Sequence, residues 1–390
     1  MITNQHKCFL ELVRAGLWGF NDKHNLDDTL FEGVDWEELY LLAEEQSVVG
    51  LLAAGLDYLK IQDSHNLKAQ ECAQRSSARF MCPLKLKLNI IGEALQIEQR
   101  NLTMNDFVVR LMEKLRNENV TAILVKGQGV ARCYEKPLWR TSGDVDLLLS
   151  NDNYNSAKTV LESIADEVAE ENKTTKHQAY VIKDFDVELH ARMPFGISGR
   201  VDKVIDEVIE SSLCSHVNVN LNDNGEVWLP RADEHVFLVF THFLHHFFIE
   251  GVGLRQICDW CRMLFTYRKS LNYGLLEQRI HKAGLITEWK VFATLAVDFL
   301  GMPIEAMPMY NENDNEDEKL KQKAEKVLMR VIKSGNFGHN KDLTYRTKYR
   351  GVKYKIVATW RRFTDFASLV PVFPMDAPSF FFTYVFNKVK

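Results

Sequence analysis

Two aspartates stand at the start of a short apolar run, in the stretch Asp-Val-Asp-Leu-Leu-Leu at 144–149. Alternate residues of a β-strand point to the same face, so Asp144 and Asp146 are expected to project side by side. Neighbouring carboxylates repel each other unless a cation compensates their charge. Proteins typically hold Mg²⁺ with one or two carboxylates together with substrate phosphates. The pair therefore predicts a site for a metal ion and a phosphorylated ligand.

The segment that precedes this strand has the pattern of a phosphate-binding turn. Residues 123–125 are apolar and predict a short strand, Lys126-Gly127-Gln128-Gly129 predicts a turn, and 130–135 predicts a short helix. The free N–H groups and the positive dipole end at a helix N-terminus attract phosphate, and Lys126 adds a charge. An isolated Asp-x-Asp pair is usually a solvated strand edge, and an isolated Lys-Gly is usually an ordinary turn. Their order in one strand–turn–helix–strand unit favours a nucleotide site.

On these residues the segment resembles the nucleotidyltransferase core of the DNA polymerase beta superfamily. More narrowly, it is similar to a bacterial nucleotidyltransferase family with a Leu-x-Lys-Gly turn, an Arg-x-x-x-Asp-x-Asp strand, a Glu-Leu-His strand and a histidine-rich helix that runs into Gly-Leu-Arg. The matching residues here are Lys126-Gly127, Arg140 with Asp144 and Asp146, Glu188-Leu189-His190, and the segment from His242 to Asp259. The superfamily's usual Gly-Ser after the first strand is replaced by Gly127-Gln128.

The resemblance implies an enzyme that moves a nucleoside monophosphate from an NTP to an acceptor hydroxyl and releases pyrophosphate. It implies two Mg²⁺ ions, with Mn²⁺ as the alternative, held by Asp144, Asp146 and a third carboxylate. The acceptor is left open as a small molecule, a protein or RNA. The residues that the resemblance assigns to the nucleotide are Lys126, Gly127, Gln128, Arg140, Ser142 and Gly143.

The third carboxylate is expected on the stretch Phe-Asp-Val-Glu-Leu-His at 185–190. Its three apolar residues alternate with Asp186, Glu188 and His190, which therefore share the opposite face of a strand. Glu188 is preferred because it stands at the matching place in the family, and Asp186 is the alternative. The competing interpretation is an ordinary amphipathic strand with a polar outer face.

A second group of polar residues follows in the C-terminal third of the chain. His242 and His246 are four apart and share a helix face, a spacing that can bind zinc. The phenylalanines around them favour histidines in a core or a groove instead. Arg255 and Asp259 are also four apart, a spacing that allows a pair across one turn. The expected acceptor pocket consists of His190, His242, His246, Arg255 and Asp259.

Two further functions stay open at this point. The first is a nucleotide-binding or partner-binding module that has the fold but no turnover. The second is a phosphohydrolase that uses a histidine-bound metal in the segment 235–259. The basic and aromatic segment 341–362 has two interpretations of its own, which are a single-stranded nucleic acid site or an amphipathic helix with its cations outward.

Composition sets the remaining bounds. The chain has 390 residues, of which 46% are hydrophobic, and the pattern of elements predicts an α+β fold with a small mixed sheet flanked by helical regions. Three regions are expected: an N-terminal helical region at 1–103, the nucleotidyltransferase-like α/β core at 104–230 and a C-terminal helical region at 231–390. The net charge of −5 argues against a general nucleic-acid binder, so no DNA partner is expected.

The expected location is the cytoplasm. Seven cysteines, an odd number, suit a reducing compartment better than a disulfide framework. The first twenty residues lack the pattern of a signal peptide, and no apolar run is long enough to span a bilayer. No membrane partner is therefore expected.

Overall fold

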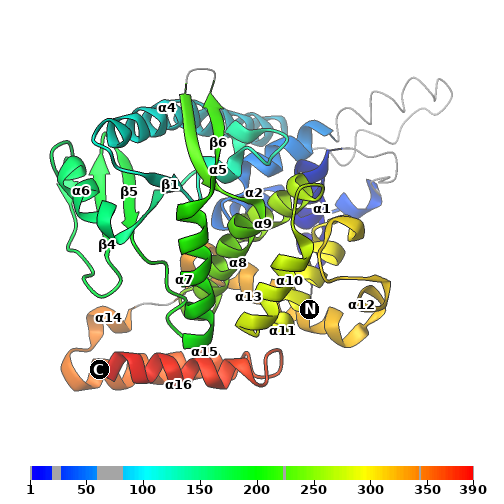
Figure 1. The fold of residues 1–390 in the computed structure, drawn as a ribbon. Helices are drawn as coiled ribbons and strands as arrows, with labels where there is room; N and C mark the ends of the chain where they lie inside the picture. The colour runs from blue at the N-terminus through cyan, green and yellow to red at the C-terminus, as the bar shows by residue number, and fades with distance from the viewer. Residues whose placement is uncertain (1, 20–27, 59–81, 223–224, 342–343, 390) are drawn as a thin grey trace.

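The computed structural model describes residues 2–19, 28–58, 82–222, 225–341 and 344–389. A five-stranded sheet, ordered β1-β2-β5-β4-β3, lies on one side of the molecule (Figure 1). β2 and β5 run parallel, and the other neighbouring strands are antiparallel. The expected α+β fold with a mixed sheet is confirmed. The strands are β1 (Ala122–Leu124), β2 (Val145–Leu149), β3 (Glu167–Val168), β4 (His177–Ile182) and β5 (Phe185–His190).

Helices surround this sheet and form most of the remaining chain. The short helix expected at 130–135 lies earlier, at 128–131, directly behind the glycine turn. A hairpin that was not predicted from the sequence, formed by β6 (His216–Asn222) and β7 (Gly225–Pro230), makes a second sheet. The helices are α1 (Asn4–Trp18), α2 (Trp36–Glu45), α4 (Leu84–Asn117), α5 (Gln128–Ala131), α6 (Asn151–Glu162), α7 (Gly199–Cys214), α8 (Ala232–Ile249), α9 (Leu254–Tyr267), α10 (Tyr273–Ala283), α11 (Ile286–Thr294), α12 (Glu312–Glu316), α13 (Glu318–Ser334), α14 (Tyr345–Lys348), α15 (Gly351–Ala367) and α16 (Asp376–Val389).

Burial explains why β2 and β5 have different sequence patterns. All five residues of β2 are buried, so the strand is almost continuously apolar, and Asp146 is its exception. β5 alternates, with Val187 and Leu189 fully buried and Glu188 half-buried on the other face. A two-residue turn, Lys183-Asp184, connects β4 to β5 with φ values of 50° and 65°, as type I′ hairpin turns require.

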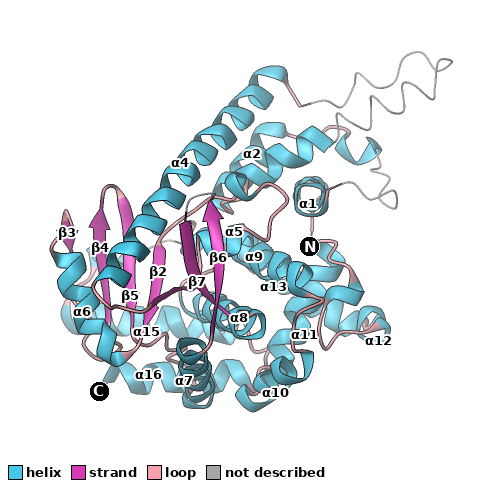
Figure 2. Cartoon of the chain, turned by 45° about the horizontal axis from the view of Figure 1, so that its top comes forward, coloured by secondary structure: helices cyan, strands magenta, loops and turns pink. Residues whose placement is uncertain are grey.

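Two hydrophobic cores hold the molecule together. One core contains the sheet, α6 and the second half of α4, and its residues run from Met104 to Leu229. The other core joins helices from both ends of the chain, including α1, α8, α9, α11 and α13. α4 is continuous across the expected boundary at 103, so it links the two cores, and the division into three regions stays a prediction. Figure 2 shows α4 along one side of the sheets and α15 and α16 at the opposite end of the molecule.

None of the described helices combines the length and apolar character that a membrane crossing requires.

Candidate active site

Strand pairing brings the predicted carboxylates together. Asp146 in β2 is the register partner of Glu188 in the parallel strand β5, and Asp144 lies just before β2. One carboxylate oxygen from each of the three residues lies within 4.8 Å of the other two. Asp186 is exposed, and the group found among the described residues contains Glu188 rather than Asp186. Three acidic side chains therefore converge at the N-terminal end of β2.

Lys126 compensates part of this negative charge. Its Nζ lies 2.7 Å from Asp146 Oδ1 and 3.1 Å from His242 Nε2. Burial by itself would lower the pKa of Lys126, but the charges of Asp146 and Asp144 outweigh burial and raise it. Burial and the nearby Lys126 charge place the pKa of His242 well below its ordinary value of 6.5. Lys126 is therefore a mostly buried cation at the cavity wall that donates to a neutral imidazole.

The two aspartates differ in their electrostatic surroundings. The charge of Asp146, and then burial, raise the pKa of Asp144. Burial by itself would raise the pKa of Asp146 as well, but the Lys126 charge and the hydrogen bond from His190 lower it. Asp146 Oδ2 is buried and lacks a hydrogen-bond partner within the described part of the chain. The site thus contains one compensated carboxylate with a free oxygen and one carboxylate under repulsion.

Two histidines support the carboxylates from the neighbouring strands. His190 Nε2 lies 2.9 Å from Asp146 Oδ1 and 3.2 Å from Glu188 Oε2, and His177 Nε2 lies 3.1 Å from the same Glu188 oxygen. The imidazole rings stack with their centroids 4.7 Å apart. Burial by itself would raise the pKa of Glu188, but the hydrogen bonds from these histidines hold it well below its ordinary value. Glu188 is therefore ionised and fixed in orientation.

His177 was missed from the sequence, although a signal for it existed. The two-residue turn between β4 and β5 makes His177 the direct partner of His190. Extending that register from Ile182 and Phe185 would have placed both histidines on the Glu188 face. His190 was expected in the acceptor pocket, but it lies buried against the carboxylates, and the described lining of the cavity does not include it.

Arg140 and Asp259 bind each other. The guanidinium donates from Nε and Nη2 to the two carboxylate oxygens of Asp259, each at 2.7 Å, and the side chains are 5% and 7% exposed. The Tyr134 hydroxyl donates to Asp259 Oδ1 at 2.7 Å. The sequence assigned Arg140 to the nucleotide, and helical spacing allowed Asp259 to pair with Arg255. The tertiary fold instead supplies Asp259 with a bidentate partner from another segment, Arg140.

The positive charge of Arg255 is less well compensated than that of Arg140. Its Nη1 donates to the Thr141 carbonyl at 2.8 Å, while its Nε is buried without a hydrogen-bond partner among the residues described. Burial, and then the neighbouring Arg140 charge, lower the pKa of Arg255. An anion bound next to Arg255 would therefore stabilise its charge and accept the missing hydrogen bond.

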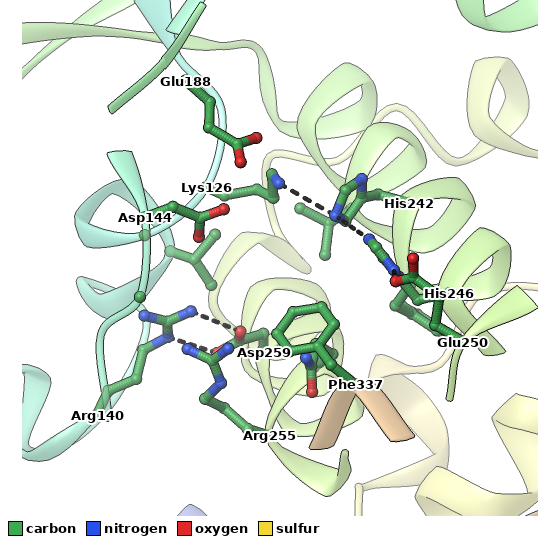
Figure 3. A pocket seen from close by; sticks show the side chains of 16 residues that line it. Lys126, Arg140, Asp144, Glu188, His242, His246, Glu250, Arg255, Asp259 and Phe337 are labelled. Carbon is green, nitrogen blue, oxygen red and sulfur yellow. Dashed lines mark hydrogen bonds and ion pairs between the residues drawn. The ribbon is translucent and has the colours of Figure 1, made fainter. Parts of the chain in front are cut away.

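One cavity of about 310 Å³ is lined by residues of both the expected nucleotide site and the expected acceptor pocket. Figure 3 shows Asp144, Glu188 and Lys126 on one side and His242 and His246 of α8 on the other, with Arg255 of α9 beside Arg140 below them. Two residues assigned to the nucleotide lie outside the described lining, namely Ser142 and Gln128. The Gln128 amide is buried and donates to Asn105 Oδ1 at 2.7 Å. The site residues that line the cavity are Lys126, Gly127, Arg140, Gly143, Asp144, Glu188, His242, His246, Arg255 and Asp259.

The α8 histidines form a hydrogen-bonded chain rather than a metal group. His242 and His246 contact each other through their Nε2 atoms at 3.0 Å, and His246 Nδ1 lies 2.8 Å from Glu250 Oε2. Within the described residues, the groups with ligand atoms close enough for an ion are Asp144, Asp146 and Glu188, and His177, Glu188 and His190. This arrangement gives no support to a zinc site on α8 or to the phosphohydrolase interpretation.

Replacement of Gly127 by alanine is expected to lower the free energy of unfolding by about 1–3 kcal/mol. Gly127 has φ 56° and ψ −121°, and an added Cβ would lie 3.0 Å from the Asp144 carbonyl oxygen. Urea unfolding measures this change. Gly92→Ala is the matched control, because an added Cβ there meets no described atom within 4 Å and α4 should gain about 0.5–1 kcal/mol. Equal effects of the two substitutions would show that the turn is not constrained.

A family model described as an uncharacterised nucleotidyltransferase matches residues 32–301. No curated protein and no solved structure matches the chain. The matched segment contains the glycine turn, the carboxylates of β2 and β5 and the polar residues of α8 and α9.

Proposed function

The chain belongs to this uncharacterised nucleotidyltransferase family, and we propose that it moves a nucleoside monophosphate from an NTP to an acceptor hydroxyl with release of pyrophosphate. Family membership supports nucleotidyl transfer in general. The observation that carries the finer proposal is the convergence of Asp144, Asp146 and Glu188 beside a cavity that also contains Lys126 and Arg255. Carboxylates for a cation and cations for phosphates are what such a transfer requires.

The three carboxylates fit a divalent cation. Asp146 Oδ2 has no hydrogen-bond partner in the described chain, and the charge of Asp146 raises the pKa of Asp144. Both features mean that negative charge is incompletely compensated. Oxygen donors suit Mg²⁺ or Mn²⁺, so Asp144, Asp146 and Glu188 would hold the ions, and two Mg²⁺ are part of the proposal. When bound, the ions would neutralise charge on the phosphates and on the leaving pyrophosphate.

The protein's own residues would position the reacting groups. Arg255 and Lys126 would attract the phosphates, and Gly127 lets the chain turn tightly beside Asp144. Arg140 would act indirectly, because its pairing with Asp259 fixes the wall next to Arg255. Phosphoryl transfer has a loose transition state, so positioning and charge contribute more than covalent chemistry does.

The reaction would form a bond between the acceptor oxygen and the α-phosphorus and break the bond from that phosphorus to the bridging oxygen of pyrophosphate. Glu188 would accept a hydrogen bond from the attacking hydroxyl, orient it and take up its proton as the new bond to phosphorus forms. Its lowered pKa makes it a weak base, which suits a loose transition state that needs little proton removal in advance. His242 and His246 line the cavity on the side facing these groups and would contact the acceptor.

A cytoplasmic location is also part of the proposal. The described cysteines are all free thiols, as a reducing compartment favours.

Calorimetry of NTP binding tests this proposal. NTP with Mg²⁺ is expected to bind at least about tenfold more tightly than NTP in a chelator, because uncompensated carboxylates repel a bare triphosphate. Asp144→Asn should remove most of this Mg²⁺ dependence. Asp186→Asn is the matched control, since that carboxylate is exposed on β5, the strand that carries Glu188, and lies outside the described metal group.

A pyrophosphate assay on the same samples separates an enzyme from a binding module. With labelled NTP and a cell extract as the source of acceptors, the wild-type protein should release pyrophosphate and label a product. NTP binding without pyrophosphate release would favour the binding module. Equal affinity with and without Mg²⁺ would remove Asp144 and Asp146 as metal ligands.

A further inference from the structure

A second and larger cavity, of about 970 Å³, adjoins the candidate active site. It lies between α13 and α15, and it shares Glu250 and Phe337 with the lining of the first cavity (Figure 3). Its cations lie beyond the residues 32–301 that match the family model. The two cavities are therefore neighbours, and a molecule seated in the second can extend toward the first.

The lining of this second cavity is strongly basic. Among its described residues, six are cations and two are carboxylates, although the whole chain carries a net charge of −5. One of the carboxylates, Glu250, already accepts a hydrogen bond from His246. Positive charge is thus concentrated here rather than spread over the surface. The cations are Lys326, Arg330, Lys333, Lys341, Arg361 and Arg362.

Several of these cations converge on a single carboxylate. Arg330 Nη2, Lys341 Nζ and Arg362 Nη1 lie 3.9, 3.6 and 4.0 Å from the Asp365 oxygens, which are long contacts for ion pairs. Arg330 Nη2 is also buried without a hydrogen-bond partner among the residues described. Burial is the main cause that lowers the pKa of Arg330 and Lys341, and neighbouring arginines add to it. The cluster is short of negative charge.

We propose that this cavity binds a phosphate monoester of the acceptor, in the nucleotidyl transfer proposed above, on which the inference rests. A phosphate group supplies two negative charges and several acceptor oxygens, which is what Arg330, Lys341 and Arg362 lack. The acceptor hydroxyl would then lie toward Glu250 and Phe337 and reach the carboxylate cluster. The group of the acceptor that binds in this cavity is thus a negatively charged phosphate.

Two classes of ligand carry a phosphate group of this kind. One is a water-soluble phosphorylated molecule that fits inside the cavity. The other is a lipid headgroup; α15, which borders the cavity, also carries apolar residues on its opposite face, where Val352, Ile356 and Trp360 are 74%, 64% and 63% exposed. Both sources use the same cations, and the test below has one arm for each.

The first arm is calorimetric titration with ribose 5-phosphate, compared with ribose. Ribose 5-phosphate is expected to bind and ribose is not. Lys341→Gln and Arg362→Gln should each weaken binding at least about tenfold, since each removes a hydrogen bond to a charged group. These side chains are partly exposed, so the variants should fold. Lys319→Gln, an exposed charge change on α13 outside the described lining, is the matched control.

The second arm is co-sedimentation with vesicles that contain phosphatidic acid, compared with neutral vesicles. Ribose 5-phosphate binding that the two variants weaken assigns a soluble acceptor, and vesicle binding that the same variants lose assigns a lipid headgroup. Either result supports the proposal. If both probes bind the variants as well as the wild type, or bind neither protein, the proposal is overturned.

NTP affinity measured on the same proteins separates this inference from the proposed function. Lys341→Gln and Arg362→Gln should leave the affinity for NTP with Mg²⁺ unchanged. A wild-type protein that binds NTP but not the phosphate probes would retain the nucleotidyltransferase proposal and lose this one. If the variants lose NTP affinity, the second cavity holds the triphosphate and the assignment to the acceptor is wrong.

Discussion

Asp144→Asn and Asp146→Asn are each expected to lower nucleotidyl transfer by at least roughly a hundredfold, as when charge stabilisation of a transition state is lost. Each substitution keeps the side-chain shape but removes one negative charge from the group that would hold the cation. Product formation from labelled NTP measures the effect. A variant that keeps near-normal transfer would remove that aspartate from the catalytic site.

The same two substitutions should affect the stability of the metal-free protein in opposite directions. Repulsion by Asp146 destabilises the ionised form of Asp144. Asp144→Asn should therefore leave the free energy of unfolding unchanged or raise it. Asp146 is bound to Lys126 and His190, so Asp146→Asn removes the carboxylate charge paired with a mostly buried cation and should cost roughly 3 kcal/mol. The sequence alone treats the two aspartates as equivalent, and only their surroundings distinguish them.

The pH dependence of stability follows the same signs. The pKa of Asp144 is raised in the folded protein, so its contribution is present at low pH and is lost as the pH rises through that pKa. The pKa of Asp146 is lowered, so its contribution is present above the ordinary value of 3.8 and is lost as the pH falls. Chemical unfolding in chelator should therefore show the Asp144→Asn difference from wild type shrinking as the pH falls toward 3.8, and the Asp146→Asn difference shrinking only as the pH falls below 3.8. Differences independent of pH would contradict this electrostatic account.

Local rules predicted the parts of the site that depend on short spacings. The period of two placed Asp186, Glu188 and His190 on one face of β5, and burial of Val187 and Leu189 bears this out. The resemblance preferred Glu188 over Asp186, and the parallel pairing of β2 with β5 gives the reason. That pairing joins strands about forty residues apart and cannot be read from either strand alone.

Contacts between distant segments were the part that local rules could not predict. Helical spacing allowed Arg255 as the partner of Asp259, but a buried carboxylate is better satisfied by the bidentate guanidinium of Arg140, 119 residues away in sequence. Gln128 looked like a phosphate-turn residue, yet its amide is used to hold the turn against α4. In both cases burial decided which polar partner was required, and burial depends on the whole fold.

Asp259→Asn is expected to lower the free energy of unfolding by about 3–5 kcal/mol, the cost of leaving one member of a buried ion pair uncompensated. Arg140 and Asp259 are 5% and 7% exposed, and Asp259 accepts from both Arg140 and Tyr134. Without the Asp259 carboxylate, the buried guanidinium groups of Arg140 and Arg255 would repel each other. The lowered pKa of Arg255 already indicates this repulsion. Urea unfolding, with the midpoint and slope fitted together, measures the loss.

Two further variants test whether the loss arises from the buried charge. Arg140→Gln combined with Asp259→Asn removes both charges and should recover part of the stability lost in the single variant. Glu207→Gln breaks an exposed pair with Lys282, in which the two side chains are 44% and 50% exposed, and should change the free energy of unfolding far less than Asp259→Asn does. If Asp259→Asn costs no more than Glu207→Gln, the Arg140–Asp259 pair does not hold the wall of the cavity. If the double variant is less stable than the single one, Arg140 contributes through contacts other than its charge.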